Sequence, residues 1–158
     1  MSFFGDLLVD YYLLNNSEIE VTGGCFMNAV SMNQTLHKTQ QTMEILRGWR
    51  LGVEQVCFVL GLPETRLRKL NRLGQDQMLP DDPDIQRRAS YVRRIAEALH
   101  TSYPTNPTMG ARWLRQKHRR LGQEPLRLIL EKGEDGLEQV LAELDCTFCW
   151  ELNSPKLN

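Results

Sequence analysis

The sequence predicts an all-α fold, and three of its features support this. Apolar residues recur at the spacing of one helix face in several segments, most clearly in residues 85–100. Gly and Pro fall mostly between these segments, where they end one helix and start the next. The composition, 41% hydrophobic and 25% charged over 158 residues, is ordinary for a globular protein. This length suits one domain, or two small helical domains that share a core.

The first 33 residues are the hardest to assign. Their apolar residues predict a short amphipathic helix. Asp6 and Asp10 interrupt the apolar start and no basic residue precedes it, which argues against a secretory signal. Met27 and Met32 offer later starting points for translation. Residues 1–33 are therefore either an N-terminal extension or partly a translated upstream segment.

Three helices are predicted in the next part of the chain. Residues 34–50 carry apolar side chains at helical spacing and contain no Pro. Residues 53–60 form a short helix that Gly61 ends. Residues 64–73 form the third, with Pro63 just ahead of it, where the missing N–H is tolerated. These helices and the Pro- and Asp-rich loop after them make up a predicted module of residues 34–84.

The second module, residues 85–145, is predicted to hold four helices. The first is 85–100, with Ile85, Ala89, Val92, Ala96 and Leu99 on one face. Thr108 is the expected N-cap of the second. Pro125 begins the third and Gly133 ends it, while 137–144 is the last. The tail, 146–158, has no clear period.

A helix-turn-helix is predicted around Gly61. Two helices that meet at a tight angle need a small residue in the first, supplied by Cys57, and a Gly at the turn. The expected buried positions are Val56, Leu60, Leu62, Leu67 and Leu70. The side chains left outside, which we expect to bind DNA, are Thr65, Arg66, Arg68, Lys69 and Arg72. The alternative is a helical hairpin that never contacts DNA.

Charge is segregated along the chain. Net charge is +4 over residues 37–75, −4 over 76–84, +8 over 85–120 and −6 over 121–152. A protein that meets nucleic acid on one surface and a protein partner on another has such a pattern, although blocks of charge also arise by chance. For one group we favour a solvated face with local ion pairs over phosphate contacts; its members are Arg87, Arg88, Arg93 and Arg94.

A series of residues near the C-terminus resembles a known family. It comprises a Trp-Leu pair, a Leu-Gly turn, a helix-starting Pro-Leu pair and a final helix, carried by Trp113, Leu114, Leu121, Gly122, Pro125, Leu126, Gly136, Val140 and Leu144. This series resembles the toxin-binding domain of the MbcA/ParS/Xre antitoxin family, and the segment around Gly61 resembles Xre-type regulators. In this pattern Trp113 is expected to be a core anchor. Residues 115–120 are a basic insert that departs from the family and would contact either phosphate or a toxin.

The resemblance implies an antitoxin of a type II toxin–antitoxin system. Such a protein binds and neutralises a cognate toxin, commonly a RES-domain protein that degrades NAD, and represses its own operon by binding operator DNA as a homodimer. Apolar residues of the tail are the expected toxin contacts: Phe148, Trp150 and Leu152. Two alternatives remain. One is a stand-alone transcription regulator without a toxin, and the other is an inhibitor whose helix-turn-helix is vestigial.

Other classes of function find little support in the sequence. Cys146 and Cys149 form a lone CxxC without the further ligands that zinc requires, so no metal site or cofactor is expected. The three His share no motif, and no nucleophile–base arrangement or phosphate-binding Gly-rich loop is present, which argues against an enzyme. No apolar run approaches the roughly 20 residues that cross a bilayer, and we expect a cytoplasmic protein with free thiols.

Overall fold

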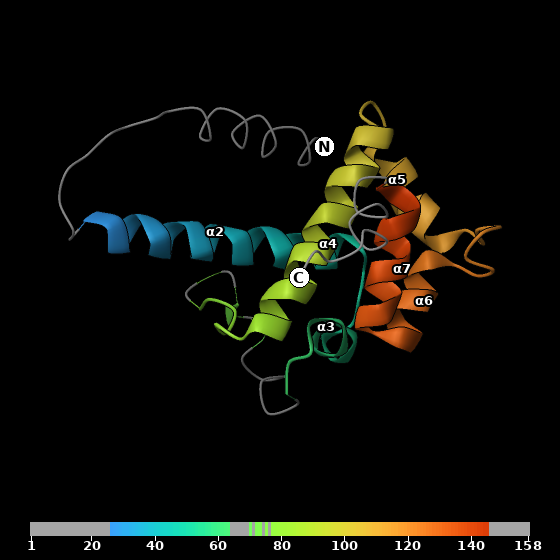
Figure 1. The fold of residues 1–158 in the computed structure, drawn as a ribbon. Coiled ribbons are helices and arrows are strands. Elements are labelled where there is room, and N and C mark those ends of the chain that lie inside the picture. The colour runs from blue at the N-terminus through green and yellow to red at the C-terminus, as the bar shows by residue number, and fades with distance from the viewer. Residues whose placement is uncertain (1–25, 64–69, 71, 74, 76, 146–158) are drawn as a thin grey trace, which may run out of the picture. The chain divides into compact units, whose positions relative to one another are not determined.

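The computed structural model describes residues 26–63, 70, 72, 73, 75 and 77–145. Over these residues the chain forms six helices and no strand (Figure 1), so the predicted all-α class is confirmed. The helices are α2 (Phe26–Gly48), α3 (Val53–Leu60), α4 (Pro83–Ser102), α5 (Pro107–Arg115), α6 (Pro125–Lys132) and α7 (Glu134–Leu144). None of the described helices has the length and apolarity needed to span a membrane.

The chain divides into two compact units, residues 1–33 and 34–158. The described part of the first unit is the beginning of α2, which starts at Phe26 rather than at residue 34 as predicted. The amphipathic helix expected near the N-terminus lies outside the described residues.

A single apolar core extends through the second unit. It takes residues from α2, α3, α4, α5, α6 and α7, and its most deeply buried members include Leu46, Leu60, Ile95, Leu114, Ile129, Leu137 and Leu141. The α7 helix packs on both α4 and α6. The N- and C-terminal modules predicted from the sequence thus share one core.

Two buried threonines join α2 to its neighbours. The Thr39 hydroxyl donates to the carbonyl of Thr35 and accepts from the backbone N–H of Leu79, 3.1 Å away. The Thr42 hydroxyl donates to the carbonyl of Lys38 and accepts from Arg93 of α4 at 2.8 Å. Both hydroxyls therefore satisfy their hydrogen bonds inside the core, which is what burying a polar group requires.

The ends of α5 and α7 differ from the prediction. Asn106, and not Thr108, caps α5, because its side-chain oxygen accepts from the backbone N–H of Thr108 at 3.2 Å. The α7 helix starts at Glu134 rather than at residue 137, directly after Gly133 has ended α6. Acidic residues in a first turn favour this earlier start, because the helix dipole is positive there.

Candidate functional site

The turn after α3 has part of the packing that the helix-turn-helix prediction required. Gly61 adopts the left-handed conformation, with φ of 69°, and its N–H donates to the carbonyls of Cys57 and Phe58. The expected burial is confirmed for Val56, Cys57, Leu60, Leu62 and Leu70. Burial also raises the pKa of the Cys57 thiol.

Most of the side chains predicted to bind DNA lie outside the residues that the structure describes. Thr65, Arg66, Arg68 and Lys69 lie outside the described residues, as does Leu67. Arg72 is described, and it is exposed in a short 3-10 turn. The helix-turn-helix and its DNA contacts therefore stay predictions.

Most residues of the C-terminal motif serve packing. Leu114, Leu126 and Val140 are buried in the core, and Pro125 is the first residue of α6. Gly122 has a positive φ of 74° in the turn that precedes α6. These motif residues thus determine how this part of the chain folds. Contacts with a partner would come from other residues, which lie on the surface.

The Trp-Leu pair is used differently from the prediction. Leu114 is fully buried, whereas Trp113 is only partly buried and packs at the margin of the core. The Trp113 ring lies against the ring of His118, with centroids 4.4 Å apart. Leu114 is therefore the anchor of α5, and Trp113 supports the loop that follows.

Gly136 allows α7 to lie very close to α6. A Cβ at this position would come within 2.5 Å of the carbonyl oxygen of Leu128 and 2.8 Å of the Cα of Ile129. Both neighbours are backbone atoms, so no side-chain rotation could relieve the clash. The glycine is needed inside α7 for this contact, and does not lie just before the helix as the predicted range 137–144 would place it.

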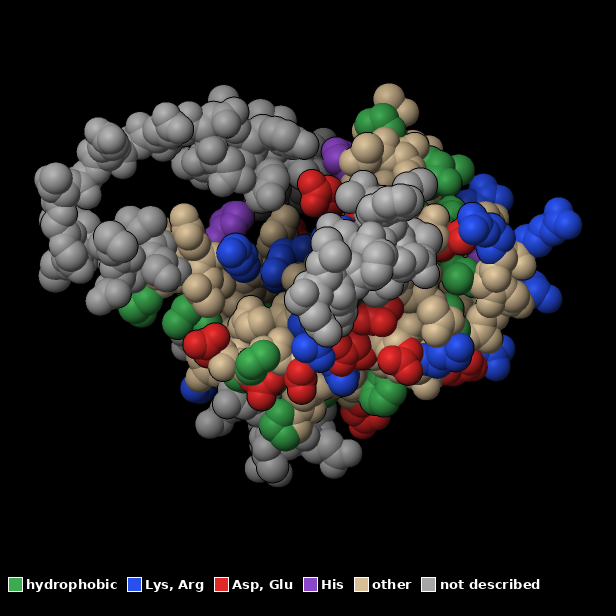
Figure 2. Space-filling view, in the orientation of Figure 1, with side chains coloured by type: hydrophobic (Ala, Val, Ile, Leu, Met, Phe, Trp, Pro, Cys, Tyr) green, Lys and Arg blue, Asp and Glu red, His purple; other side chains and the backbone are tan. Residues whose placement is uncertain are grey.

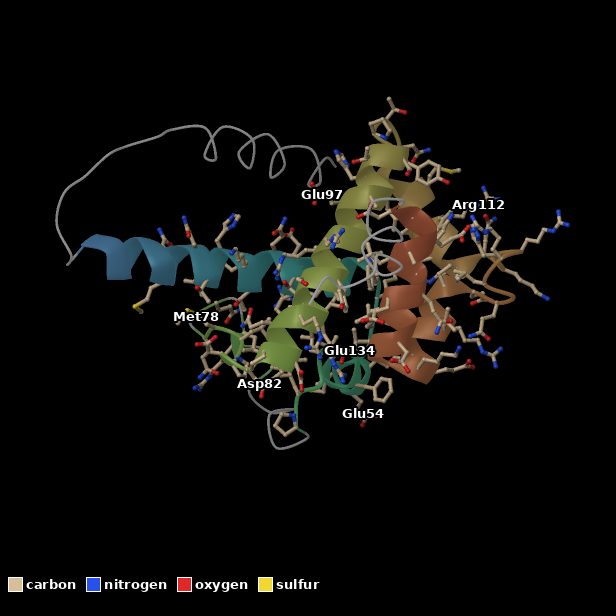
Figure 3. The ribbon with its side chains drawn as sticks, viewed as in Figure 1. Glu54, Met78, Asp82, Glu97, Arg112 and Glu134 are labelled. Atoms are coloured by element: carbon tan, nitrogen blue, oxygen red, sulfur yellow. The ribbon has the colours of Figure 1, made fainter. Side chains whose placement is uncertain are left out.

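Arg87, Arg88 and Arg94 make ion pairs, as predicted, and most of their carboxylate partners lie on α7 and at its end. Arg87 and Arg88 both bind Glu134, which Figure 3 shows at the beginning of α7. Arg94 binds Asp145 at 2.8 Å. The pair between Arg87 and Asp84 is local to α4. These contacts lower the pKa of Glu134, first through its hydrogen bond with Arg87.

A tyrosine lies in the middle of the same contact between α4 and α7. The Tyr91 hydroxyl donates to Glu138 at 2.9 Å, and burial followed by this hydrogen bond raises the pKa of Tyr91. Three carboxylates of α7 and its end, on Glu134, Glu138 and Asp145, are thus engaged by α4. Much of the acidic C-terminal block is therefore used within the molecule.

The basic insert forms an ordered loop between α5 and α6. The His118 N–H donates to the carbonyl of Gln123 at 3.0 Å, and the Gly122 N–H donates to the carbonyl of His118 at 2.9 Å. Arg115 donates to the carbonyl of Trp49 at 2.6 Å. An open depression is lined by Lys117, His118, Arg119, Arg120 and Glu143.

Two apolar side chains of α3 are exposed, and neither was selected as a site residue from the sequence. Val53 is 44% exposed and Phe58 is 49% exposed. The ring of Phe58 lies beside Gly133, 3.6 Å from where a Cβ would stand. Its only sequence signal was that the helix-turn-helix pattern left it without a buried position. The predicted toxin contacts, Phe148, Trp150 and Leu152, lie outside the described residues.

Comparison with known proteins identifies the C-terminal part of the chain. Residues 96–146, about a third of the chain, match the model of the antitoxin Xre/MbcA/ParS C-terminal toxin-binding domain. This match extends from the second half of α4 to the end of α7. Searches of curated proteins and of solved structures returned no match. The resemblance read from the sequence is confirmed: residues 96–146 are similar to the toxin-binding domain of the Xre/MbcA/ParS antitoxin family.

Proposed function

We propose that this protein is the antitoxin of a type II toxin–antitoxin system, and that it binds and neutralises a RES-domain toxin that degrades NAD. The observation that carries the proposal is the match of residues 96–146 to an antitoxin toxin-binding domain. Catalysis would belong to the toxin. The antitoxin would act by covering it, so no catalytic side chain is assigned to this chain.

The tail and the apolar residues of α3 offer contacts for the toxin. Phe148, Trp150 and Leu152 are three large apolar residues just beyond the domain match. Val53 and Phe58 add exposed apolar surface on α3. Large apolar and aromatic side chains commonly supply most of the energy of a protein interface.

Co-expression with the product of the adjacent gene tests this function. The full-length chain should co-purify with that protein and suppress its NAD-degrading activity. If the full-length chain neither binds the neighbouring product nor suppresses its activity, the antitoxin assignment fails and a stand-alone regulator takes its place.

Point variants of the full chain locate the contact better than truncation. Residues of α4 bond to Thr42 of α2 and to the carbonyl of Phe58 of α3, so a fragment that starts near residue 85 would uncover the core. Replacing Phe148, Trp150 and Leu152 together with Ala should abolish co-purification. The matched variant Val53→Ser with Phe58→Ser asks whether α3 contributes instead.

The second part of the proposal is that the protein represses its own operon as a homodimer, through the helix-turn-helix. The support is the left-handed Gly61 turn and the buried residues on both sides of it. Arg68→Ala should weaken operator binding by about 1–3 kcal/mol if the side chain reads a base. A mobility-shift titration at several salt concentrations measures this. Unchanged operator affinity after joint replacement of Arg66, Arg68 and Lys69 would exclude this mode of binding.

A further inference from the structure

The end of α5 and the loop after it gather positive charge that the fold leaves almost uncompensated. We call this the basic surface, and its exposed members are Arg112, Arg115, Lys117, Arg119 and Arg120. Figure 2 shows the blue side chains on the right, and Figure 3 labels Arg112 beside them. One carboxylate pairs with them: Glu143 lies 3.3 Å from Arg120, which remains 79% exposed. Within the described part of the chain, Arg112, Lys117 and Arg119 make no ion pair.

The basic surface is held in place before any partner arrives. The His118 ring packs on Trp113, and the Gly122 N–H closes the loop onto the His118 carbonyl. Arg115 ties the base of the loop to the carbonyl of Trp49. A fixed backbone reduces the ordering entropy that binding would otherwise cost, so these cations are arranged in advance.

The basic surface carries no exposed large hydrophobic side chain, and its nearest aromatic residue, Trp113, is partly buried and packs on His118. Among the described residues, the exposed large hydrophobic side chains are Met32, Val53, Phe58 and Met78. None of them belongs to α5 or to the loop. Specific protein interfaces are depleted of charge at their centre and rely on buried apolar anchors. Arg and Lys side chains without such anchors are typical of contacts to phosphate.

We propose that the basic surface binds the phosphate backbone of double-stranded DNA, at a place separate from the predicted recognition helix. The contact would be independent of base sequence, because phosphates carry no direct sequence information. It goes beyond the proposed repression, since it places DNA contacts within the segment that matches a toxin-binding domain.

The test compares two full-length variants that lose the same charge. The first carries Arg112→Gln, Lys117→Gln and Arg119→Gln. The control carries Lys38→Gln, Arg127→Gln and Lys132→Gln, which remove exposed cations on α2 and α6. Fluorescence anisotropy with a short labelled duplex of unrelated sequence is measured over a range of salt concentrations. The slope of log affinity against log salt should fall by about three in the first variant, roughly one for each lost phosphate contact, and stay unchanged in the control.

A charge-preserving variant guards against misfolding. Arg112→Lys with Arg119→Lys keeps both positive charges and should keep the wild-type slope. An unchanged slope in the Gln variant, or an equal fall in the control, would overturn the proposal. So would loss of toxin co-purification with the DNA slope unchanged, because the basic surface would then serve a protein partner. Co-purification of the wild-type chain reports separately on the antitoxin function.

Discussion

Two arginine-rich parts of this chain have similar composition and opposite uses. In α4, Arg88 and Arg94 turn toward α7 and bind Glu134 and Asp145. In the loop after α5, Arg119 turns outward, with no ion-pair partner in the described part of the chain. The difference lies in the neighbouring element and not in the arginines.

The partners on α7 and at its end meet α4 in the same order along the chain, although their spacing differs. Arg88, Tyr91 and Arg94 stand one turn apart along α4, and they meet Glu134, Glu138 and Asp145 in the same order. Among the described residues, the carboxylate that pairs with a cation of the loop is Glu143. A run of arginines is therefore structural or functional according to what the fold places opposite it.

The largest effect on the basic loop should come from replacing the buried residue that holds α5, the helix before it, in the core. Leu114 is fully buried, so Leu114→Ala should lower the free energy of unfolding by about 3–4 kcal/mol. The adjacent Trp113 is partly exposed, and Trp113→Ala should cost less. Urea denaturation of both variants measures the difference. A larger loss at Trp113 would reverse the roles given to the two residues.

The ion pairs between α4 and α7 depend on how closely α7 lies against α6. Gly136→Ala would bring its Cβ against the backbone of Leu128 and should destabilise the fold by about 2–3 kcal/mol. Gln139→Ala, at an exposed position of the same helix, is the control and should change little. Thermal unfolding compares them. Equal melting temperatures for the two variants would mean that α7 can shift without loss.

Replacing the Glu134 carboxylate tests how much its ion pairs with α4 contribute to stability at different pH values. Glu134→Gln should cost about 1 kcal/mol near neutral pH, because its arginine partners are partly exposed and screened by solvent. The folded-state pKa of Glu134 is lowered, so its contribution is present above the unfolded pKa and is lost as pH falls through the folded value. The wild-type chain should thus approach the variant in stability on acidification.

The matched variant for this experiment is Glu97→Gln. Glu97 is exposed on the same α4 helix that supplies the arginine partners. Denaturation series at several pH values should show its stability following the wild type. A gap between wild type and Glu134→Gln that persists in acid would show that the carboxylate acts through packing instead of charge.

The smallest expected effect is on the loop itself. Arg119→Ala and Lys117→Ala should each change stability by less than about 0.5 kcal/mol, as exposed substitutions usually do. Arg88→Ala serves as the paired contrast, since it leaves Glu134 with one partner fewer. Chemical denaturation decides. A loss of stability at Arg119 as large as that at Arg88 would remove the distinction between the two regions.

Gly and Pro residues predicted helix ends correctly where no tertiary contact overrides them. The bounds of α3 were predicted because Gly61 ends it, and α6 because Pro125 and Gly133 enclose it. The start of α7 was missed because Gly136 looks like a helix boundary in sequence, whereas its reason is the contact with Leu128. Tertiary contacts of this kind leave no periodic trace.

The site was predictable to the level of the family and no further. The order of Trp113, Leu114, Gly122 and Pro125 was enough to identify the domain, because these residues determine how it folds. The pairing of α4 with α7 could not be read from the sequence, since it depends on which helices face each other. The ordered shape of the basic loop was likewise hidden, because it rests on a bond to Trp49 far away in the chain.

Gly133 ends α6 and also caps α7, so a single residue separates the two helices. That junction has no slack in length. One inserted residue would turn α7 by about 100° about its own axis, because a helix advances that far per residue. Its carboxylates would leave the arginines of α4, and Gly136 would no longer face the backbone of α6. The length of the junction between α6 and α7 is therefore constrained by contacts with α4, which is not part of the junction.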